Sequence, residues 1–177
     1  MTTDEEFNIL LQKTLRYEGF SEFTDDPLDH GGATKWGVIQ ATALHYYPDI
    51  DVRNLTFAQA AHIYRVGYFD WIPPEIIDIK IAWVLFDAGV NCGAGRSCKF
   101  LQRVLTVPET GEADPATIDA LFSYQAEDGW QKSLFDALET LRAVYYRAIV
   151  DRDPTQKKFL AGWLRRAGDL CQDLPAA

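Results

Sequence analysis

The segment from Glu75 to Asn91 constrains the fold of this chain most strongly, because it carries apolar side chains around its whole circumference. These side chains are Ile76, Ile77, Ile79, Ile81, Ala82, Val84, Leu85 and Phe86. A helix that is apolar on every side has to be enclosed by other elements. We therefore expect a buried central helix that starts after Pro73-Pro74 and is broken at Gly93-Ala94-Gly95.

Helical periodicity also dominates the rest of the chain. A first helix ending at Gly19 is expected to bury one face, made of Phe7, Leu10, Leu11 and Leu15. Caps, prolines and glycines mark further helices over 39–47, from residue 56, over 97–105, from residue 114, over 128–150 and over 155–170. Only the polar, turn-rich stretch from Gly19 to about Trp36 can hold strands. The sequence thus predicts an all-α fold with a small β-hairpin or irregular segment.

Composition narrows the class of protein. A chain of 177 residues with 47% hydrophobic and 24% charged residues is expected to form a single domain over 1–177. The net charge of -9, with Lys and Arg scattered along the sequence, argues against a nucleic-acid partner. No run approaches the roughly 18 apolar residues of a membrane span, and residues 1–6 lack signal-peptide character. We expect synthesis in the cytoplasm without a signal peptide, and no integral membrane segment.

The cysteines and histidines do not form a metal-binding pattern. Cys92, Cys98 and Cys171 are an odd set, so reduced thiols are expected, although Cys92 and Cys98 are close enough in sequence to pair. The histidines are dispersed and no pair of residues has zinc-ligand spacing. We expect no metal and no cofactor.

Glu18 is the first candidate catalytic residue. It lies eleven residues after Phe7, which places both within about 20° on a helical wheel, so Glu18 faces the core side of the first helix. Partial burial at a helix carboxyl terminus raises the pKa of a carboxyl group. A general acid needs such a pKa, although a surface glutamate near a helix end is the alternative interpretation.

An acidic, glycine-rich loop follows Glu18 and supplies partners for it. Glycoside hydrolysis requires a proton donor and a second group on the opposite face of the sugar, and Asp29 is the candidate for the second group. Asp26 lies three residues away and can take the same role. Thr34 adds a hydroxyl that can hold a water. The alternatives are an acidic turn started by Asp26-Pro27, or a calcium loop, for which the EF-hand spacing is missing.

These residues resemble glycoside hydrolase family 108, a group of lysozyme-like muramidases found in phage endolysins and secretion-associated loci. The family pattern is approximately E-G-G, an aromatic, then D-P-x-D-x-G-G-x-T-x-x-G-I. The matching residues here are Glu18-Gly19, Asp26-Pro27-Leu28-Asp29-His30-Gly31-Gly32-Ala33-Thr34 and Gly37-Val38. Phe20 replaces the second glycine of E-G-G, His30 stands where proline is common, and Val38-Ile39 replaces isoleucine and a small hydroxyl residue.

The resemblance continues into a second segment, similar to the peptidoglycan-binding module of that family. Asp87, Val90, Asn91 and Gly93 fit its D-x-x-V-N-x-G, residues 101–105 fit L-Q-x-x-L, and residues 162–166 resemble G-W-x-x-R. The stretch 109–117 keeps the threonine of D-G-x-x-G-x-x-T but does not preserve its glycine pattern clearly. The resemblance implies a lysozyme-like fold with a catalytic segment over 1–85 and a helical, peptidoglycan-binding-like segment over 86–172.

The resemblance also implies site residues and a reaction. Glu18 is the implied general acid, and Asp29 with Thr34 places the hydrolytic water. Asp26, Trp36 and Asn91 are further candidates for substrate contacts, with a core position for Trp36 and a helix cap for Asn91 as alternatives. Arg165 or Arg166 is expected to form structural ion pairs.

We therefore expect a monomeric N-acetylmuramidase that cleaves the β-1,4 bond between N-acetylmuramic acid and N-acetylglucosamine in peptidoglycan, with inversion favoured by analogy. The expected setting is a phage or prophage endolysin, or a secretion-associated lysozyme, acting on the periplasmic cell wall after holin- or secretion-dependent release. The alternatives are a lytic transglycosylase and a non-catalytic protein of peptidoglycan binding or secretion assembly.

Overall fold

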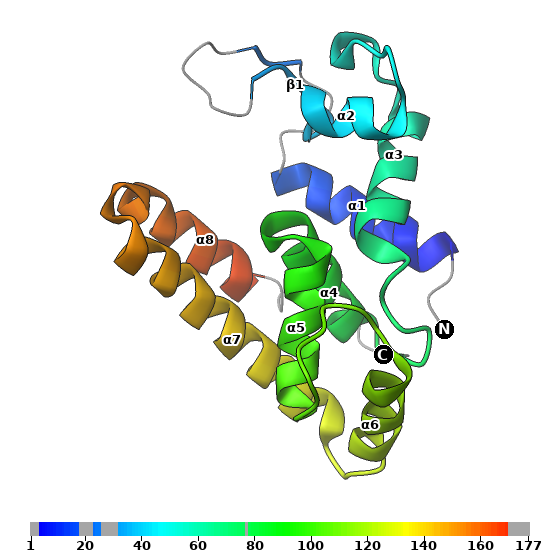
Figure 1. Ribbon diagram of the computed structural model, residues 1–177, viewed down its shortest axis with the longest axis vertical. Helices are drawn as coiled ribbons and strands as arrows, with labels where there is room; N and C mark the ends of the chain where they lie inside the picture. The colour runs from blue at the N-terminus through cyan, green and yellow to red at the C-terminus, as the bar shows by residue number, and fades with distance from the viewer. Residues whose placement is uncertain (1–3, 18–22, 26–31, 77, 170–177) are drawn as a thin grey trace. The chain divides into compact units, whose positions relative to one another are not determined.

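The computed structural model describes residues 4–17, 23–25, 32–76 and 78–169 of the chain. These residues form eight α-helices, three short 3-10 or π-helical turns and one two-stranded sheet (Figure 1). They divide into two compact units, an N-terminal unit over Asp4–Asp70 and a C-terminal unit from Trp71 onward. The all-α prediction with a small hairpin is confirmed. No helix in the described ranges has both the length and the apolar character needed to cross a membrane.

The N-terminal unit begins with α1, Asp4–Tyr17. Phe7, Leu10, Leu11 and Leu15 are all buried, as their shared helical face predicted. Arg65 ties the start of α1 to a later turn, because its guanidinium contacts Asp4 at 2.7 Å and Asp70 at 2.8 Å. The expected end of the first helix at Gly19 lies outside the described residues.

A short antiparallel hairpin follows the acidic loop. Strands β1 (Thr34–Lys35) and β2 (Val38–Ile39) pair Thr34 with Ile39 and Lys35 with Val38. Trp36 and Gly37 form the turn, with φ of 55° and 71°. Two consecutive positive φ values match the twist of a two-residue hairpin turn, although such a conformation is uncommon for tryptophan. The hairpin extends the predicted strand region by three residues, to Ile39.

The rest of the N-terminal unit is helical. Its elements are α2 (Gln40–Tyr46), η1 (Val52–Asn54), α3 (Phe57–Tyr64) and η2 (Arg65–Phe69), the last of which is a π-helical turn. The predicted capping box at the start of α3 is present. The Gln59 amide donates to Thr56 Oγ1 at 3.3 Å, and the Thr56 amide donates to Gln59 Oε1 at 3.0 Å.

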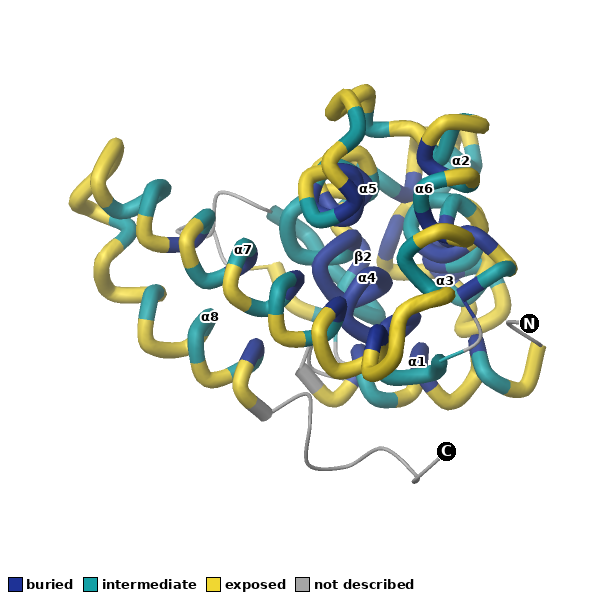
Figure 2. The backbone as a smooth tube through the Cα atoms, turned by 90° about the horizontal axis from the view of Figure 1, so that it is seen from below, coloured by how far each residue is buried: buried dark blue, intermediate teal, exposed yellow. Residues whose placement is uncertain are grey.

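The C-terminal unit is built around α4. Its helices are α4 (Ile79–Cys92), α5 (Ala94–Val104), α6 (Pro115–Gln125), α7 (Trp130–Arg152), η3 (Pro154–Gln156) and α8 (Lys157–Asp169). Every residue of α4 from Ile81 to Gly89 is buried, and the helix packs against α5 and α7 (Figure 2). The predicted central helix is confirmed, but it starts four residues later than Glu75. Asp78 sets that start, because its Oδ1 accepts the amides of Lys80 and Ile81.

Glycine and proline set the boundaries of the later helices. Gly93 separates α4 from α5 with φ 91° and ψ 140°, a conformation that only glycine adopts readily. Asp114 caps α6 and Pro115 opens it, as predicted. Helices α7 and α8 then run side by side as an antiparallel hairpin joined through Asp153 and η3 (Figure 1).

Candidate functional site

Three of the predicted site residues are described by the structure and three are not. Glu18, Asp26 and Asp29 lie outside the described residues, so their catalytic and binding roles stay predictions. Thr34 and Trp36 lie on the hairpin of the N-terminal unit, and Asn91 lies in the last turn of α4 in the C-terminal unit.

Thr34 is held firmly at the start of β1. Its amide donates to Thr24 O at 2.8 Å, its carbonyl accepts the Thr24 amide at 2.9 Å, and its hydroxyl donates to Gly32 O at 3.0 Å. Because the hydroxyl donates its hydrogen to Gly32 O, its oxygen lone pairs remain available to accept a hydrogen bond. The side chain is half-buried. This arrangement suits a residue that accepts a hydrogen bond from a water.

Trp36 is anchored by both its backbone and its indole. Nε1 donates to Leu55 O at 3.2 Å, and the Trp36 carbonyl accepts the hydroxyl of Tyr64 at 3.1 Å. The ring meets Phe57 edge-on, with 5.2 Å between the centroids. The indole N–H is therefore engaged within the fold. Contact with a sugar would use the ring surface of this half-buried side chain rather than its N–H.

Asn91 is engaged through its amide oxygen. The Tyr146 hydroxyl donates to Asn91 Oδ1 at 3.4 Å. Helix α4 continues one residue further, and Gly93 caps it by donating to Gly89 O at 2.8 Å. The capping role considered for Asn91 therefore belongs to Gly93, and the sugar-binding role stays a prediction.

The strongest electrostatic feature of the C-terminal unit is a buried ion cluster centred on Asp87. Both Asp87 and Arg142 are fully buried. Arg166 Nη2 donates to Asp87 Oδ1 at 2.7 Å, and Arg142 Nη2 donates to Asp87 Oδ2. Arg142 Nε also donates to the Tyr146 hydroxyl at 2.8 Å. The cluster joins α4, α7 and α8, and it confirms a structural ion pair for Arg166.

The sequence contains one signal for this buried ion cluster. Asp87 stands on a helix that is apolar on every side, and a buried carboxylate needs a cationic partner. Arg142 was not identified from the sequence, since 55 positions separate it from Asp87.

Glu139 extends the cluster toward the surface. Its Oε1 lies 3.7 Å from Arg142 Nη1. Burial raises the pKa of Glu139 to about 7, while the charge of Arg142 opposes that increase. This carboxyl group therefore titrates near neutral pH without belonging to the predicted catalytic set.

Gln102, from the L-Q-x-x-L stretch, anchors a loop. The two hydrogens on its fully buried amide nitrogen are shared among three acceptors, Thr110 Oγ1, the Glu112 carbonyl and Thr117 Oγ1, which lie 2.8 to 3.0 Å from the nitrogen. Its amide oxygen accepts the Gly111 N–H at 2.9 Å. The motif residues Gln102 and Thr117 therefore shape the loop between α5 and α6.

A stack of aromatic rings accounts for the tryptophan of G-W-x-x-R. Trp163 lies between Tyr146 and Phe159, with centroid separations of 5.4 Å and 5.9 Å and interplanar angles of 29°. The stack holds α8 on α7 beside the buried ion cluster. Trp163 is thus a packing residue.

The cysteines are unpaired where they are described. Cys92 and Cys98 are both free thiols, and Cys171 lies outside the described residues. Burial raises the pKa of Cys98 to about 12, so this thiol stays protonated at neutral pH. Among the described residues, no group of three or more His, Cys, Asp or Glu side chains is arranged to hold a metal ion.

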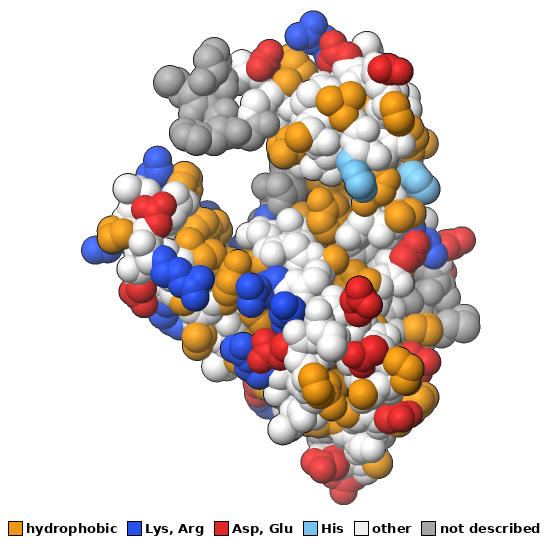
Figure 3. Space-filling model, viewed as in Figure 1, with side chains coloured by type: hydrophobic (Ala, Val, Ile, Leu, Met, Phe, Trp, Pro, Cys, Tyr) orange, Lys and Arg blue, Asp and Glu red, His pale blue; other side chains and the backbone are white. Residues whose placement is uncertain are grey.

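Charged side chains of the same sign lie together on the surface of the C-terminal unit, although they are dispersed along the sequence. Lys and Arg side chains cluster over α5 and α7, while Asp and Glu side chains gather over α6 (Figure 3). A chain with a net charge of -9 therefore carries a locally basic surface.

Family comparison identifies both halves of the chain. Residues 11–93 match the family described as Glycosyl hydrolase 108. These residues therefore form a segment of the glycosyl hydrolase 108 type. Residues 96–168 match a domain described as Predicted Peptidoglycan domain. Together the two matches support a glycoside hydrolase that acts on peptidoglycan.

Comparison with solved structures supports the lysozyme-like fold. The structure of Brucella abortus SagA superposes on this protein with a TM-score of 0.70 at 21% sequence identity, covering 97% of this chain and 98% of that one. No curated protein matches the sequence.

The first family match ends at Gly93, directly after α4, and the second begins at Arg96, in the first turn of α5. Helix α4 nevertheless packs with the C-terminal helices. The division expected at residues 85 and 86 falls within α4 and stays a prediction.

Proposed function

We propose that this protein is an N-acetylmuramidase, which hydrolyses the β-1,4 bond between N-acetylmuramic acid and N-acetylglucosamine. The observation that carries the proposal is the family match over residues 11–93, because this segment contains Glu18, Asp29 and Thr34 in the family's order. Glu18 donates a proton to the leaving oxygen. Asp29 and Thr34 orient the attacking water on the opposite face of the sugar.

The hairpin supports the role assigned to Thr34. Water placement requires an acceptor that does not move, and three hydrogen bonds to Thr24 and Gly32 hold Thr34 at the end of the acidic loop. Asp26, Trp36 and Asn91 are assigned to contacts with the glycan. No metal or other cofactor takes part in the proposed reaction.

Substitution of the three acids tests the catalytic assignment. Glu18→Gln should lower the rate of reducing-end release from purified sacculi by about 10²- to 10⁴-fold, the usual contribution of a general acid. Asp29→Asn should lower it more than Asp26→Asn. Asp25→Asn is the matched control, since Asp25 is an exposed acid in the same stretch and should retain wild-type activity.

Product analysis tests the reaction. Reducing N-acetylmuramic acid ends are expected. Products with 1,6-anhydro ends would show a lytic transglycosylase instead, and sacculus binding without any cleavage would show a non-catalytic binding protein. Either result would overturn the proposal.

We also propose that the protein acts as a monomer in a phage or prophage lysis system, reaching the periplasmic wall from the cytoplasm after holin-dependent release. A secretion-associated lysozyme is the alternative setting. Expression in a Gram-negative host should cause lysis only when a holin is co-expressed. Lysis at the same rate without a holin would contradict this setting.

A further inference from the structure

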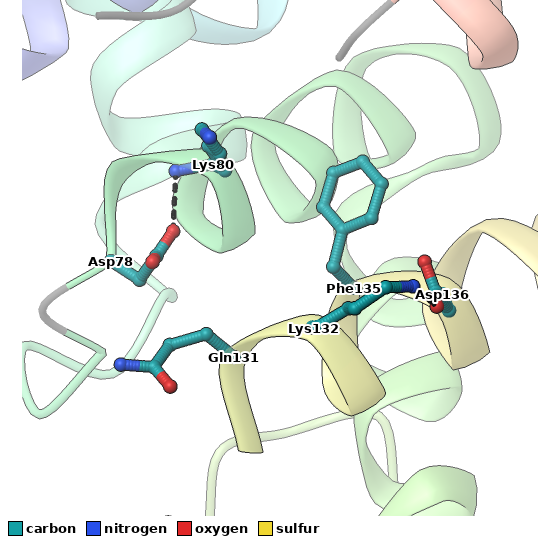
Figure 4. Close-up of a pocket in the computed structure, with 6 residues that line it drawn as sticks. All are labelled: Asp78, Lys80, Gln131, Lys132, Phe135 and Asp136. Atoms are coloured by element: carbon teal, nitrogen blue, oxygen red, sulfur yellow. Dashed lines mark hydrogen bonds and ion pairs between the residues drawn. The ribbon is translucent and has the colours of Figure 1, made fainter. Parts of the chain in front are cut away.

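A pocket opens in the C-terminal unit between the start of α4 and the start of α7 (Figure 4). Its volume is about 320 Å³. The lining side chains are Asp78, Lys80, Gln131, Lys132, Phe135 and Asp136. Ligand pockets in proteins range from about 300 to 1,000 Å³, so this one is large enough for one or two amino-acid residues.

The lining combines both signs of charge with one aromatic ring. Phe135 is half-buried, and its ring stands between α7 and α4 (Figure 4). Gln131 and Asp78 lie to one side of the ring, and the ion pair of Lys132 with Asp136 lies to the other. The pocket therefore offers an apolar surface flanked by polar groups.

Several of these polar groups can form further hydrogen bonds or ion pairs with a ligand. Asp78 uses Oδ1 to cap α4, where it accepts the Lys80 amide at 2.8 Å and the Ile81 amide at 3.2 Å. Its second oxygen has no partner among the described residues. The ammonium of Lys80 and the side-chain amide of Gln131 likewise make no hydrogen bond or ion pair within the described part of the chain. A cation, a carboxylate oxygen and an amide are thus available at one pocket.

We propose that this pocket binds the stem peptide of peptidoglycan, and this proposal rests on the proposed function. The sugars of the glycan are essentially uncharged, because the lactyl carboxyl group of muramic acid is joined to the peptide. Charges of both signs lie on the stem peptide, which carries free carboxylates and the free amino group of a diamino acid. The Lys80 ammonium pairs with a peptide carboxylate, and Asp78 accepts from the amino group. Gln131 bonds the peptide backbone, and Phe135 contacts the aliphatic side chain.

The position of the pocket in the sequence agrees with this ligand. Asp78 and Lys80 come from the segment that matches Glycosyl hydrolase 108, and Gln131, Phe135 and Asp136 come from the segment that matches the Predicted Peptidoglycan domain. A ligand held here would contact both segments within one compact unit.

Titration of the full chain with a soluble stem tetrapeptide containing a diamino acid tests the proposal. Amide NMR shifts should change at residues 78–81 and 131–136. Lys80→Met and Phe135→Ala should each weaken binding at least fivefold. The matched controls Lys158→Met and Phe122→Ala change exposed residues outside the pocket and should bind as the wild type does. Shifts confined to other residues, or equal affinities for pocket and control variants, would overturn the proposal.

A second measurement separates failure of the pocket from failure of the proposed hydrolase. Reducing-end release is followed on intact sacculi and on glycan strands freed of peptide by an amidase. Wild-type protein should have a lower KM for the peptide-bearing substrate, and Lys80→Met should remove most of that difference without changing kcat. If Lys80→Met leaves the difference intact, the pocket does not bind the peptide. If the wild type cleaves neither substrate, the hydrolase proposal fails, while the peptide titration still decides the pocket.

Discussion

Arg166, near the end of α8, holds the buried carboxylate of Asp87 in α4 with two nitrogens, Nη2 at 2.7 Å and Nε at 3.0 Å. Such a two-point contact fixes both position and orientation. Because α8 otherwise packs mainly on α7, this contact anchors the carboxyl-terminal end of α8, which lies away from the α7–α8 turn, to the central helix. Two residues that match separate family patterns, D-x-x-V-N-x-G and G-W-x-x-R, thereby meet at one structural contact.

Asp87→Asn should destabilise the protein strongly. The substitution removes the countercharge of Arg142 and Arg166 and leaves buried cations uncompensated, which typically costs about 3 to 5 kcal/mol. Urea unfolding followed by circular dichroism measures the loss. Glu109→Gln is the control, since it breaks an exposed pair with Arg103 and should cost less than about 1 kcal/mol. Equal losses in the two variants would contradict the structural role of Asp87.

Glu139 should make stability depend on pH near neutrality. Burial raises its pKa from 4.5 to about 7, so folding favours the protonated form. Its stabilising contribution is complete below pH 4.5 and is lost as the pH rises toward 7. At about 1.4 kcal/mol per pH unit, the loss approaches about 3 kcal/mol.

The Glu139→Gln variant isolates this contribution. Its free energy of unfolding should match that of the wild type at pH 4 and exceed it at pH 8, because glutamine carries no charge to bury. Urea titrations at several pH values measure the difference between the two proteins. A difference that stays constant with pH would rule out the titration of Glu139 as its cause.

Gln102→Leu should loosen the loop between α5 and α6. It leaves the Gly111 amide and the hydroxyls of Thr110 and Thr117 without their amide partner, at a cost of about 2 to 4 kcal/mol. Hydrogen exchange at Gly111 should accelerate more than exchange in α4. Gln125→Leu serves for comparison, since the side chain of Gln125 makes one bond among the described residues, to the Glu75 carbonyl, and its loss should cost about 1 kcal/mol.

Thr56→Ala should cost about 1 kcal/mol by removing the capping box of α3. Thr56→Ser keeps the hydroxyl and should retain most of the stability. Thermal unfolding of the two variants compares them directly. If serine does not restore stability, the effect of Thr56 comes from its methyl group rather than from capping.

Local signals in the sequence predicted the elements well where a single residue sets the boundary. The caps at Thr56 and Asp114 are confirmed, because an N-cap acts on amides two or three residues away. The start of α4 was placed too early. The apolar pattern begins before the helix does, since it already includes Ile76. The helix itself starts at Ile79, because Asp78 is its N-cap.

The residues of the candidate site were predictable from the sequence only in part. Motif spacing proposed Thr34, and aromatic character proposed Trp36 as a surface for a sugar ring. The hairpin holds these two residues through Gly32, Thr24 and Leu55. Their partners were not predictable, because the carbonyls that accept these bonds carry no sequence signature. The positive φ of Trp36 was also unexpected, since that turn position usually selects glycine or asparagine.

The sequence by itself determined the helical class, the central helix and the order of the acids in the loop, because periodicity, caps and motif spacing are short-range properties. Only the tertiary structure decided what the second segment does with its motif residues. Asp87 meets Arg142 and Arg166 across 55 and 79 positions, and burial of that carboxylate depends on how three helices pack. Charge pairing of this kind is a property of spatial proximity and desolvation, which no local pattern encodes.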